Sequence, residues 1–143
     1  PDPPFELDDP DWPIRTYQGQ YPPARIISND RQNPRSGVAV NSLICDGAVI
    51  DNALVCDSIL SPGVVVEPGA EVESCVIMEG TVVGRNCRLR NAIIDKHVRI
   101  PSGTRIGYEP EEDSHRFTIT KKGVVVIPKE LPFEQGFEVP VTT

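Results

Sequence analysis

Long apolar runs are missing from this sequence of 143 residues. No stretch approaches the roughly 18 apolar residues of a membrane-spanning helix, and no signal peptide opens the chain. Aromatic residues make up only 6%, and the net charge of −7 argues against a general nucleic-acid-binding protein. These absences favour a cytoplasmic protein that binds neither a membrane nor nucleic acid.

Cysteine is also scarce, and its spacing excludes the common cysteine-based sites. The four cysteines form no C-x-x-C pair and no pattern typical of zinc: Cys45, Cys56, Cys75 and Cys87. We therefore expect reduced thiols and no metal site. A phosphate-binding glycine loop, a G-x-S-x-G elbow and a recognisable carboxylate pair are missing too. The sequence therefore predicts no catalytic residue and no cofactor site in this chain.

Proline and glycine are abundant by contrast, with 15 and 11 residues. That proline content is about twice the usual share, which argues against a helical bundle and favours short strands joined by turns. The chain begins at Pro1, and its one methionine is Met78. We interpret this as a piece of a longer protein.

An internal repeat of aliphatic residues is the strongest signal. Successive members are five, six and six residues apart, so three steps make a period of 17. The members are Val38, Leu43, Val49, Val55, Leu60, Val66, Val72, Ile77, Val83, Leu89, Ile94, Ile100 and Ile106. Two residues before each, from Val49 on, stands a small or β-branched residue: Gly47, Ala53, Ser58, Val64, Ala70, Cys75, Thr81, Cys87, Ala92, Val98 and Thr104.

This pattern predicts an all-β fold, a parallel β-helix with 17-residue coils. Side chains two apart on a strand share a face, so each aliphatic residue and its small partner fill one interior corner. Val49, Val66, Val83 and Ile100 should then stack on one another, and the five-residue step implies one tighter corner per coil. Cys75 and Cys87 should be buried, whereas Cys45 and Cys56 should lie outside. The hexapeptide pattern resembles the left-handed parallel β-helix family, which implies a left-handed solenoid.

The flanks divide the chain into three parts: residues 1–37, the β-helix over 38–107, and a C-terminal cap over 108–143. The first part shows no repeat and should be mostly irregular, with apolar anchors at Phe5, Trp12, Ile14 and Tyr17. Residues 109–113 suit a short helical turn. Residues 117–120 and 124–127 predict a hairpin that caps the last coil. The tail from Leu131 to Thr143 carries no strong signal.

Charge is sorted along the repeat. No lysine or arginine lies between Ser36 and Gly84, where acidic residues give −7, whereas residues 85–105 carry a net charge of +5. Arg88 and Arg105 are 17 apart and should lie on adjacent coils, where two cations repel unless an anion or an acidic partner intervenes. Two interpretations remain open: a solvated face neutralised by acidic groups, or a site for a small phosphorylated anion.

Motifs in the flanks and in the last coils carry a more specific resemblance. They include Asp11–Tyr17 (DWPIRTY), Pro22–Ile26 (PPARI), Val83–Arg90 (VGRNCRLR), Ile93–Lys96 (IIDK), Glu112–Phe117 (EDSHRF) and Gly123–Val126 (GVVV). Over about residues 4–129 the chain resembles the C-terminal β-helix domain of bacterial ADP-glucose pyrophosphorylases, the glucose-1-phosphate adenylyltransferases.

This resemblance implies a parent enzyme that makes ADP-glucose and pyrophosphate from ATP and glucose 1-phosphate, with Mg²⁺, in glycogen synthesis. It implies an N-terminal nucleotidyltransferase domain, a homotetramer, and regulation by small metabolites such as fructose 1,6-bisphosphate, AMP or pyruvate. The nucleotide-binding motifs are missing here, so we expect no catalysis by this chain alone. The expected role is regulation and oligomerisation.

The resemblance also implies an allosteric anion site at Lys96 and Lys129, to which the charge pattern adds Arg88 and Arg105. At Lys96 the family often has an arginine, and lysine keeps that charge but loses the bidentate fork. Two alternatives stay open. One is a hexapeptide acyltransferase that uses His97 as its base, and the other is a purely structural β-helix.

Overall fold

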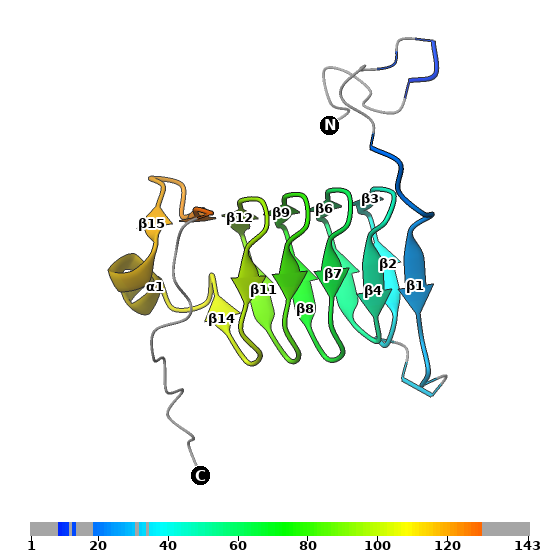
Figure 1. Cartoon of the computed structure of the whole chain (residues 1–143). Helices are drawn as coiled ribbons and strands as arrows, with labels where there is room; N and C mark the ends of the chain where they lie inside the picture. Colours follow the sequence, from blue (N-terminus) through cyan, green and yellow to red (C-terminus); the bar gives the residue numbers. More distant parts are fainter. Residues whose placement is uncertain (1–8, 12, 14–18, 31, 34, 130–143) are drawn as a thin grey trace.

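Three parallel sheets, here named A, B and C, form the sides of a solenoid in a computed structural model that describes residues 9–11, 13, 19–30, 32–33 and 35–129 (Figure 1). Sheet A contains β1 (Arg25–Ile27), β4 (Val49–Asp51), β7 (Val65–Val66), β10 (Val82–Val83) and β13 (Arg99–Ile100). Sheet B contains β2 (Val38–Val40), β5 (Leu54–Cys56), β8 (Glu71–Glu73), β11 (Arg88–Arg90) and β14 (Arg105–Ile106). Sheet C contains β3 (Leu43–Ile44), β6 (Ile59–Leu60), β9 (Val76–Ile77), β12 (Ala92–Ile94), β16 (Val125–Ile127) and β15 (Thr118–Ile119). The chain visits the sheets in turn, which confirms the predicted parallel β-helix.

The corners of the coil are built on residues in the left-handed backbone region. The tight corners between sheets B and C each turn on one polar residue with φ between 48° and 52°: Asn41, Asp57, Ser74 and Asn91. Such short polar side chains tolerate this conformation better than other non-glycine residues do. The corners between sheets C and A are one residue longer and turn mainly on glycine, as at Gly63 and Gly80. The predicted tight corner in each coil is therefore confirmed.

The interior follows the predicted registers from Ala53 onward. The aliphatic residues from Val55 to Ile106 in that register are at most 1% exposed, and Val66, Val83 and Ile100 stack in register as predicted. The small register is buried too, from Ala53 to Val98, with Thr104 half-buried. Removing these side chains from water is the main favourable contribution to folding.

In the first coil the predicted register is wrong by one residue. Val38 pairs with Leu54, Leu43 with Ile59 and Val49 with Val65, so all three face outward. The inward positions belong to Ala39, Ile44 and Ile50, and Ala48 is buried where Gly47 was expected. The cause is the corner after β4, where Ile50 and Val55 are five residues apart, whereas Val66 and Val72 are six apart.

Asn52 explains why that corner is short. It turns the chain with φ 46°, and its side-chain oxygen accepts hydrogen bonds from the Asn29 backbone N–H (2.7 Å) and the Ser36 hydroxyl (3.0 Å). The same side chain donates to Asp51 Oδ1 at 2.6 Å. The corner is thus fastened to the preceding loop, which stabilises a turn without glycine.

Both ends of the solenoid carry additional elements. At the N-terminal end β1 adds a strand to sheet A, within the segment expected to be mostly irregular, while Phe5, Trp12, Ile14 and Tyr17 lie outside the described residues. At the other end α1 (Pro110–Arg116) replaces the expected helical turn, and the buried Asp113 accepts a hydrogen bond from the Gly107 N–H at 2.8 Å. The predicted hairpin is confirmed: β15 pairs antiparallel with β16, and β16 continues sheet C beside β12.

None of the helices in the described part of the chain is long and apolar enough to cross a membrane.

Two corner glycines near the C-terminal end allow a matched test of this geometry. Gly103 and Gly107 both have positive φ, 76° and 86°. A Cβ at Gly103 would meet nothing within 4 Å, whereas one at Gly107 would overlap the carbonyl group of Arg90. We expect Gly103→Ala to lower the free energy of unfolding by about 1 kcal/mol, the cost of the left-handed conformation alone. Gly107→Ala should cost at least about 3 kcal/mol because a backbone clash is added. Urea unfolding of both variants measures this, and equal losses would contradict it.

Candidate functional site

The two lysines predicted to bind anions lie at the corner between sheets C and A. Lys96 follows β12 and Lys129 follows β16, each two residues after the register pair Ile94 and Ile127. The ladder continues past this pair, because the Asp95 N–H donates to the Ile127 carbonyl oxygen at 3.0 Å. Both lysines are exposed. The structure therefore places them at equivalent positions of adjacent coils, about 4.8 Å apart along the backbone.

The two arginines of the predicted site lie elsewhere, on the outer face of sheet B. Arg88 and Arg105 pair in register, as expected from their 17-residue separation. Arg88 also pairs with Glu71 on its other side, and their charged groups are 3.9 Å apart with both side chains well exposed. The guanidinium of Arg105 lies 5.3 Å from the centroid of the Tyr108 ring. Each arginine thus has a partner within the chain, although exposed pairs of this kind contribute little to stability.

The four predicted site residues therefore form two groups on different sides of the solenoid. In a three-sided coil the corner between sheets C and A is opposite the outer face of sheet B. A small metabolite bound to the lysines lies on the far side of the solenoid from the arginines. The 17-residue spacing predicted that Arg88 and Arg105 are adjacent, and the resemblance pointed to Lys96 and Lys129. Neither showed that the two pairs lie on different sides of the solenoid.

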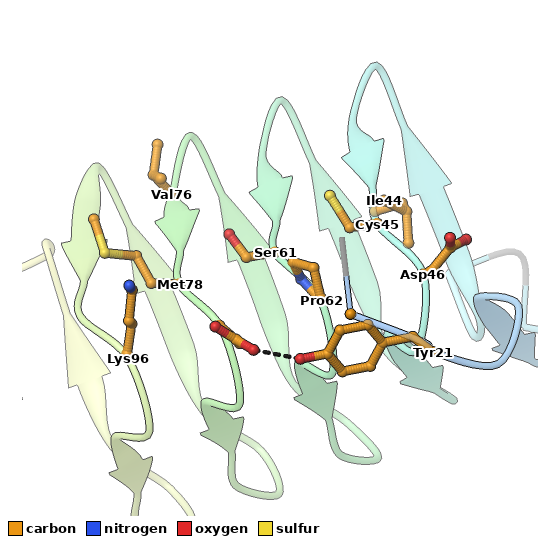
Figure 2. Close-up of a pocket in the computed structure, with 11 residues that line it drawn as sticks. Tyr21, Ile44, Cys45, Asp46, Ser61, Pro62, Val76, Met78 and Lys96 are labelled. Carbon is orange, nitrogen blue, oxygen red and sulfur yellow. Dashed lines mark hydrogen bonds between the residues drawn. The ribbon is translucent and has the colours of Figure 1, made fainter. Parts of the chain in front are cut away.

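A pocket of about 780 Å³ opens at the corner that carries Lys96 (Figure 2). The segment before β1 forms one wall: the Tyr21 ring lies against Gly47, and its hydroxyl donates a hydrogen bond to Glu79 Oε1. The Gly47 N–H also donates to the Pro22 carbonyl oxygen at 2.6 Å. Because a Cβ at Gly47 would be 2.9 Å from Tyr21 Cδ1, glycine allows this close approach.

The lining of the pocket is mixed in character. Its apolar part comes from sheet C and the corner that follows it, and includes Ile44, Val76 and Met78. Its charged part comes from the corner, with Asp46 and Glu79 in the earlier coils and Lys96 in a later one. Such a surface can take an apolar or aromatic group beside sheet C and a negative group near Lys96.

Sequence reasoning missed this pocket because Tyr21 lies in a segment without periodicity. A usable signal was present in the corner residues, which recur at steps of 16, 17 and 17 through Asp46, Pro62, Glu79 and Lys96. Reading this third register would have placed the two acids and the lysine on one edge.

His97, the candidate base of the alternative acyltransferase function, is an exposed corner residue. Its φ of 56° is left-handed, and its ring lies against Gly80 of the preceding coil, where a Cβ would overlap Nδ1. A structural role in turning the corner accounts for these features. Within the described residues there is no group of three or more His, Cys, Asp or Glu side chains that could hold a metal ion.

The four thiols are all free. Cys75 and Cys87 point inward as predicted, and their thiols donate to the carbonyl oxygens of Glu73 (3.1 Å) and Pro101 (3.0 Å). Burial raises the pKa of the Cys75 thiol to about 11 and also raises the pKa of Cys87. Cys45 and Cys56 lie outside the core and are half-buried. The pKa of each thiol is raised, mainly by partial burial and to a smaller extent by nearby carboxylates.

Comparison with known proteins finds matches over nearly all of the chain. Residues 22–127 match the family described as "GlmU-like, C-terminal hexapeptide". The chain is 41% identical over 133 residues to a glucose-1-phosphate adenylyltransferase of Anaeromyxobacter sp. (strain Fw109-5). This match covers 93% of the present chain and 32% of the relative. The chain is 43% identical over 129 residues to that of Dechloromonas aromatica (90% and 29%) and 40% identical over 138 residues to that of Koribacter versatilis (96% and 33%). The chain spans about a third of the length of these relatives.

The two kinds of cysteine should differ in reactivity. At pH 8 a thiol with a pKa of about 11 is only about 0.1% thiolate, and a buried thiol is also shielded from reagent. We expect iodoacetamide to modify Cys45 and Cys56 in the native chain, and Cys75 and Cys87 only after denaturation. Peptide mass spectrometry over time measures the order. Modification of Cys75 at the rate of Cys56 in native protein would contradict the burial described above.

Proposed function

Because the chain belongs to the GlmU-like C-terminal hexapeptide family, we propose that it is the C-terminal part of a glucose-1-phosphate adenylyltransferase. The observation that carries this proposal is an identity of 40–43% spread over about 90% or more of the chain, including both flanks of the solenoid. A shared β-helix alone supports only a shared fold, because this architecture serves many functions. The match extends beyond the solenoid on both sides, which supports a relationship closer than a shared hexapeptide repeat.

In this proposal the parent enzyme joins ATP and glucose 1-phosphate to give ADP-glucose and pyrophosphate, in the cytoplasm and for glycogen synthesis. An N-terminal nucleotidyltransferase domain binds ATP and Mg²⁺ and performs the transfer. The chain described here contributes no residue to that step. It supplies a rigid solenoid for assembly of the homotetramer and a surface at which a metabolite acts.

We assign the anion-binding role to Lys96 and Lys129. Two ammonium groups at equivalent positions of adjacent coils repel each other, and a phosphate between them replaces repulsion with two charge-assisted hydrogen bonds. The neighbouring pocket offers room for the rest of a small phosphorylated metabolite. Arg88 and Arg105 provide a second basic pair, but an anion there must compete with Glu71 and Tyr108.

Regulation then follows from the position of the lysine pair at the corner. An anion that contacts both this corner and the catalytic domain favours one arrangement of the two domains over the other. That difference in affinity between two arrangements is what allosteric coupling requires. Lysine binds phosphate as a point charge without the fork of arginine, so selectivity among anions depends on the pocket beside it.

A chimaeric enzyme tests both parts of the proposal. The matching third of the Anaeromyxobacter relative is replaced by this chain, and ADP-glucose synthesis is measured while fructose 1,6-bisphosphate or AMP is varied. We expect activity in the chimaera and none in the 143-residue chain alone. Lys96→Ala or Lys129→Ala should raise the half-maximal effector concentration about tenfold or more, since each loses a charge-assisted hydrogen bond.

Lys122→Ala is the matched control, because Lys122 is an exposed lysine in the hairpin turn between β15 and β16. The assignment of the effector site fails if all three variants respond alike. A folded chimaera without ADP-glucose synthesis overturns the assignment to this enzyme.

A further inference from the structure

The outer face of sheet C carries an unbroken column of aliphatic side chains. Residues paired in register point to the same side of a sheet, and these five each precede an inward residue in their strand. They pair in succession from β3 to β16: Leu43, Ile59, Val76, Ile93 and Val126. Leu43 is 44% exposed and the other four are half-buried. We call these five residues the outer column; at about 4.8 Å per coil it is about 19 Å long.

The other two outer faces differ from this one. On sheet A the equivalent column is shorter: it has three valines and a charged residue at each end, Arg25 and Arg99. On sheet B it becomes a ladder of charged residues, in which Glu71, Arg88 and Arg105 follow Leu54. An apolar column of this length on one side of a soluble solenoid is typical of a surface that a partner covers.

Charged residues run beside the outer column in a fixed order. At the corner between sheets C and A, Asp46 belongs to the first coil of the column, Glu79 to the middle coil, and Lys96 and Lys129 to the last two. The edge is therefore negative at the N-terminal end of the column and positive at its C-terminal end. The two ends of this edge are complementary to a second copy that runs in the opposite direction, because Asp46 then faces Lys129. At the middle, Glu79 faces the Glu79 of the other copy, and each of these carboxylates accepts a hydrogen bond from its own Tyr21.

We propose that two copies of this chain pack sheet C against sheet C with their solenoid axes antiparallel. A two-fold axis passes beside Val76, the middle residue of the outer column, so that Ile59 of one copy lies opposite Ile93 of the other. Leu43 then lies opposite Val126, and Asp46 lies opposite Lys129. Each contact occurs twice, as an isologous interface requires. The two flat columns exclude water, and the corner charges fix the direction.

The parallel arrangement lacks this complementarity. With a two-fold axis along the solenoid, each corner between sheets C and A would face the corner between sheets B and C of the same coil. Glu79 would then meet the coil of Glu73 and Ser74, and Lys96 would meet Asn91. In the first coil Asp46 would meet Asn41. The parallel arrangement therefore lacks the pair of Asp46 and Lys129 that the antiparallel arrangement forms twice.

This inference deepens the assembly part of the proposed function by naming the surface and the partner. It shares Lys129 with the proposed anion site and Val76 with the pocket, so the interface is tested in the absence of effector. The chimaera reports ADP-glucose synthesis, whereas the experiment below reports molecular mass, so failure of one is distinguishable from failure of the other.

Sedimentation equilibrium of the 143-residue chain from 1 µM to 1 mM tests the interface. We expect a reversible dimer whose dissociation constant rises at least tenfold in Ile59→Lys and in Ile93→Lys. Val65→Lys and Val82→Lys are the matched controls, because these half-buried valines face outward on sheet A of neighbouring coils. They should leave the dissociation constant within twofold. Circular dichroism and thermal unfolding identify any variant that does not fold.

Two further variants test the direction of packing. Asp46→Lys should weaken the dimer, and the double variant Asp46→Lys with Lys129→Asp should restore it, because the pair is exchanged across the two-fold axis. In a background of Cys45→Ser and Cys56→Ser, Val76→Cys should form a disulfide between copies under oxidising conditions. Ile59→Cys should form one only when mixed with Ile93→Cys.

Three results would overturn the proposal. The first is a chain that stays monomeric at 1 mM. The second is a dimer that responds equally to the sheet A and sheet C variants. The third concerns the chimaera: Ile59→Lys and Ile93→Lys have no effect on its self-association, and the thiol of Val76→Cys is protected from modification. That result would assign the outer face of sheet C to contact with the N-terminal domain.

Discussion

Parallel backbone pairing between successive coils is the constraint on which the rest of this molecule depends. Each strand from β4 to β12 is paired on both sides with the equivalent strand of a neighbouring coil, so a residue's environment there is decided by its position within the coil. Inward positions form stacked aliphatic columns, corner positions form a row of left-handed residues, and outward positions form ladders. Charge and apolarity are therefore arranged as columns that run along the solenoid.

These columns connect the fold to the sites. Lys96 and Lys129 are neighbours because their strands pair, although 33 residues separate them in the sequence. Arg88 is next to both Glu71 and Arg105 for the same reason. The pocket at the corner adds two residues from outside the repeat, Gly19 and Tyr21, and the Tyr21 hydroxyl donates a hydrogen bond to Glu79. A regular scaffold thus presents a small number of side chains, and an irregular segment completes the surface around them.

Much of this organisation was predictable from the amino-acid sequence, and the failures have identifiable causes. From Ala53 to Ile106 the aliphatic and small registers coincide with the buried positions, because only one phase of the repeat is consistently apolar there. In the first coil Leu43 and Ile44, and Val49 and Ile50, are apolar neighbours, so either phase fits and the short corner at Asn52 decides between them. Tyr21 lies outside the repeating part of the sequence, and its place became visible only in three dimensions. The separation of Lys96 from Arg88 depends on the side of the coil, which linear spacing does not convey.

The repeated coil also has a consequence for how this architecture changes in evolution. Between Leu60 and Ile106 every 17 residues return the chain to the same sheet, so one coil inserted or removed there keeps every inward and outward position in phase. The only effect is to move the helix and hairpin at the C-terminal end by about 4.8 Å along the axis. The number of coils therefore sets the distance between the first strand and the C-terminal cap, in steps of one coil.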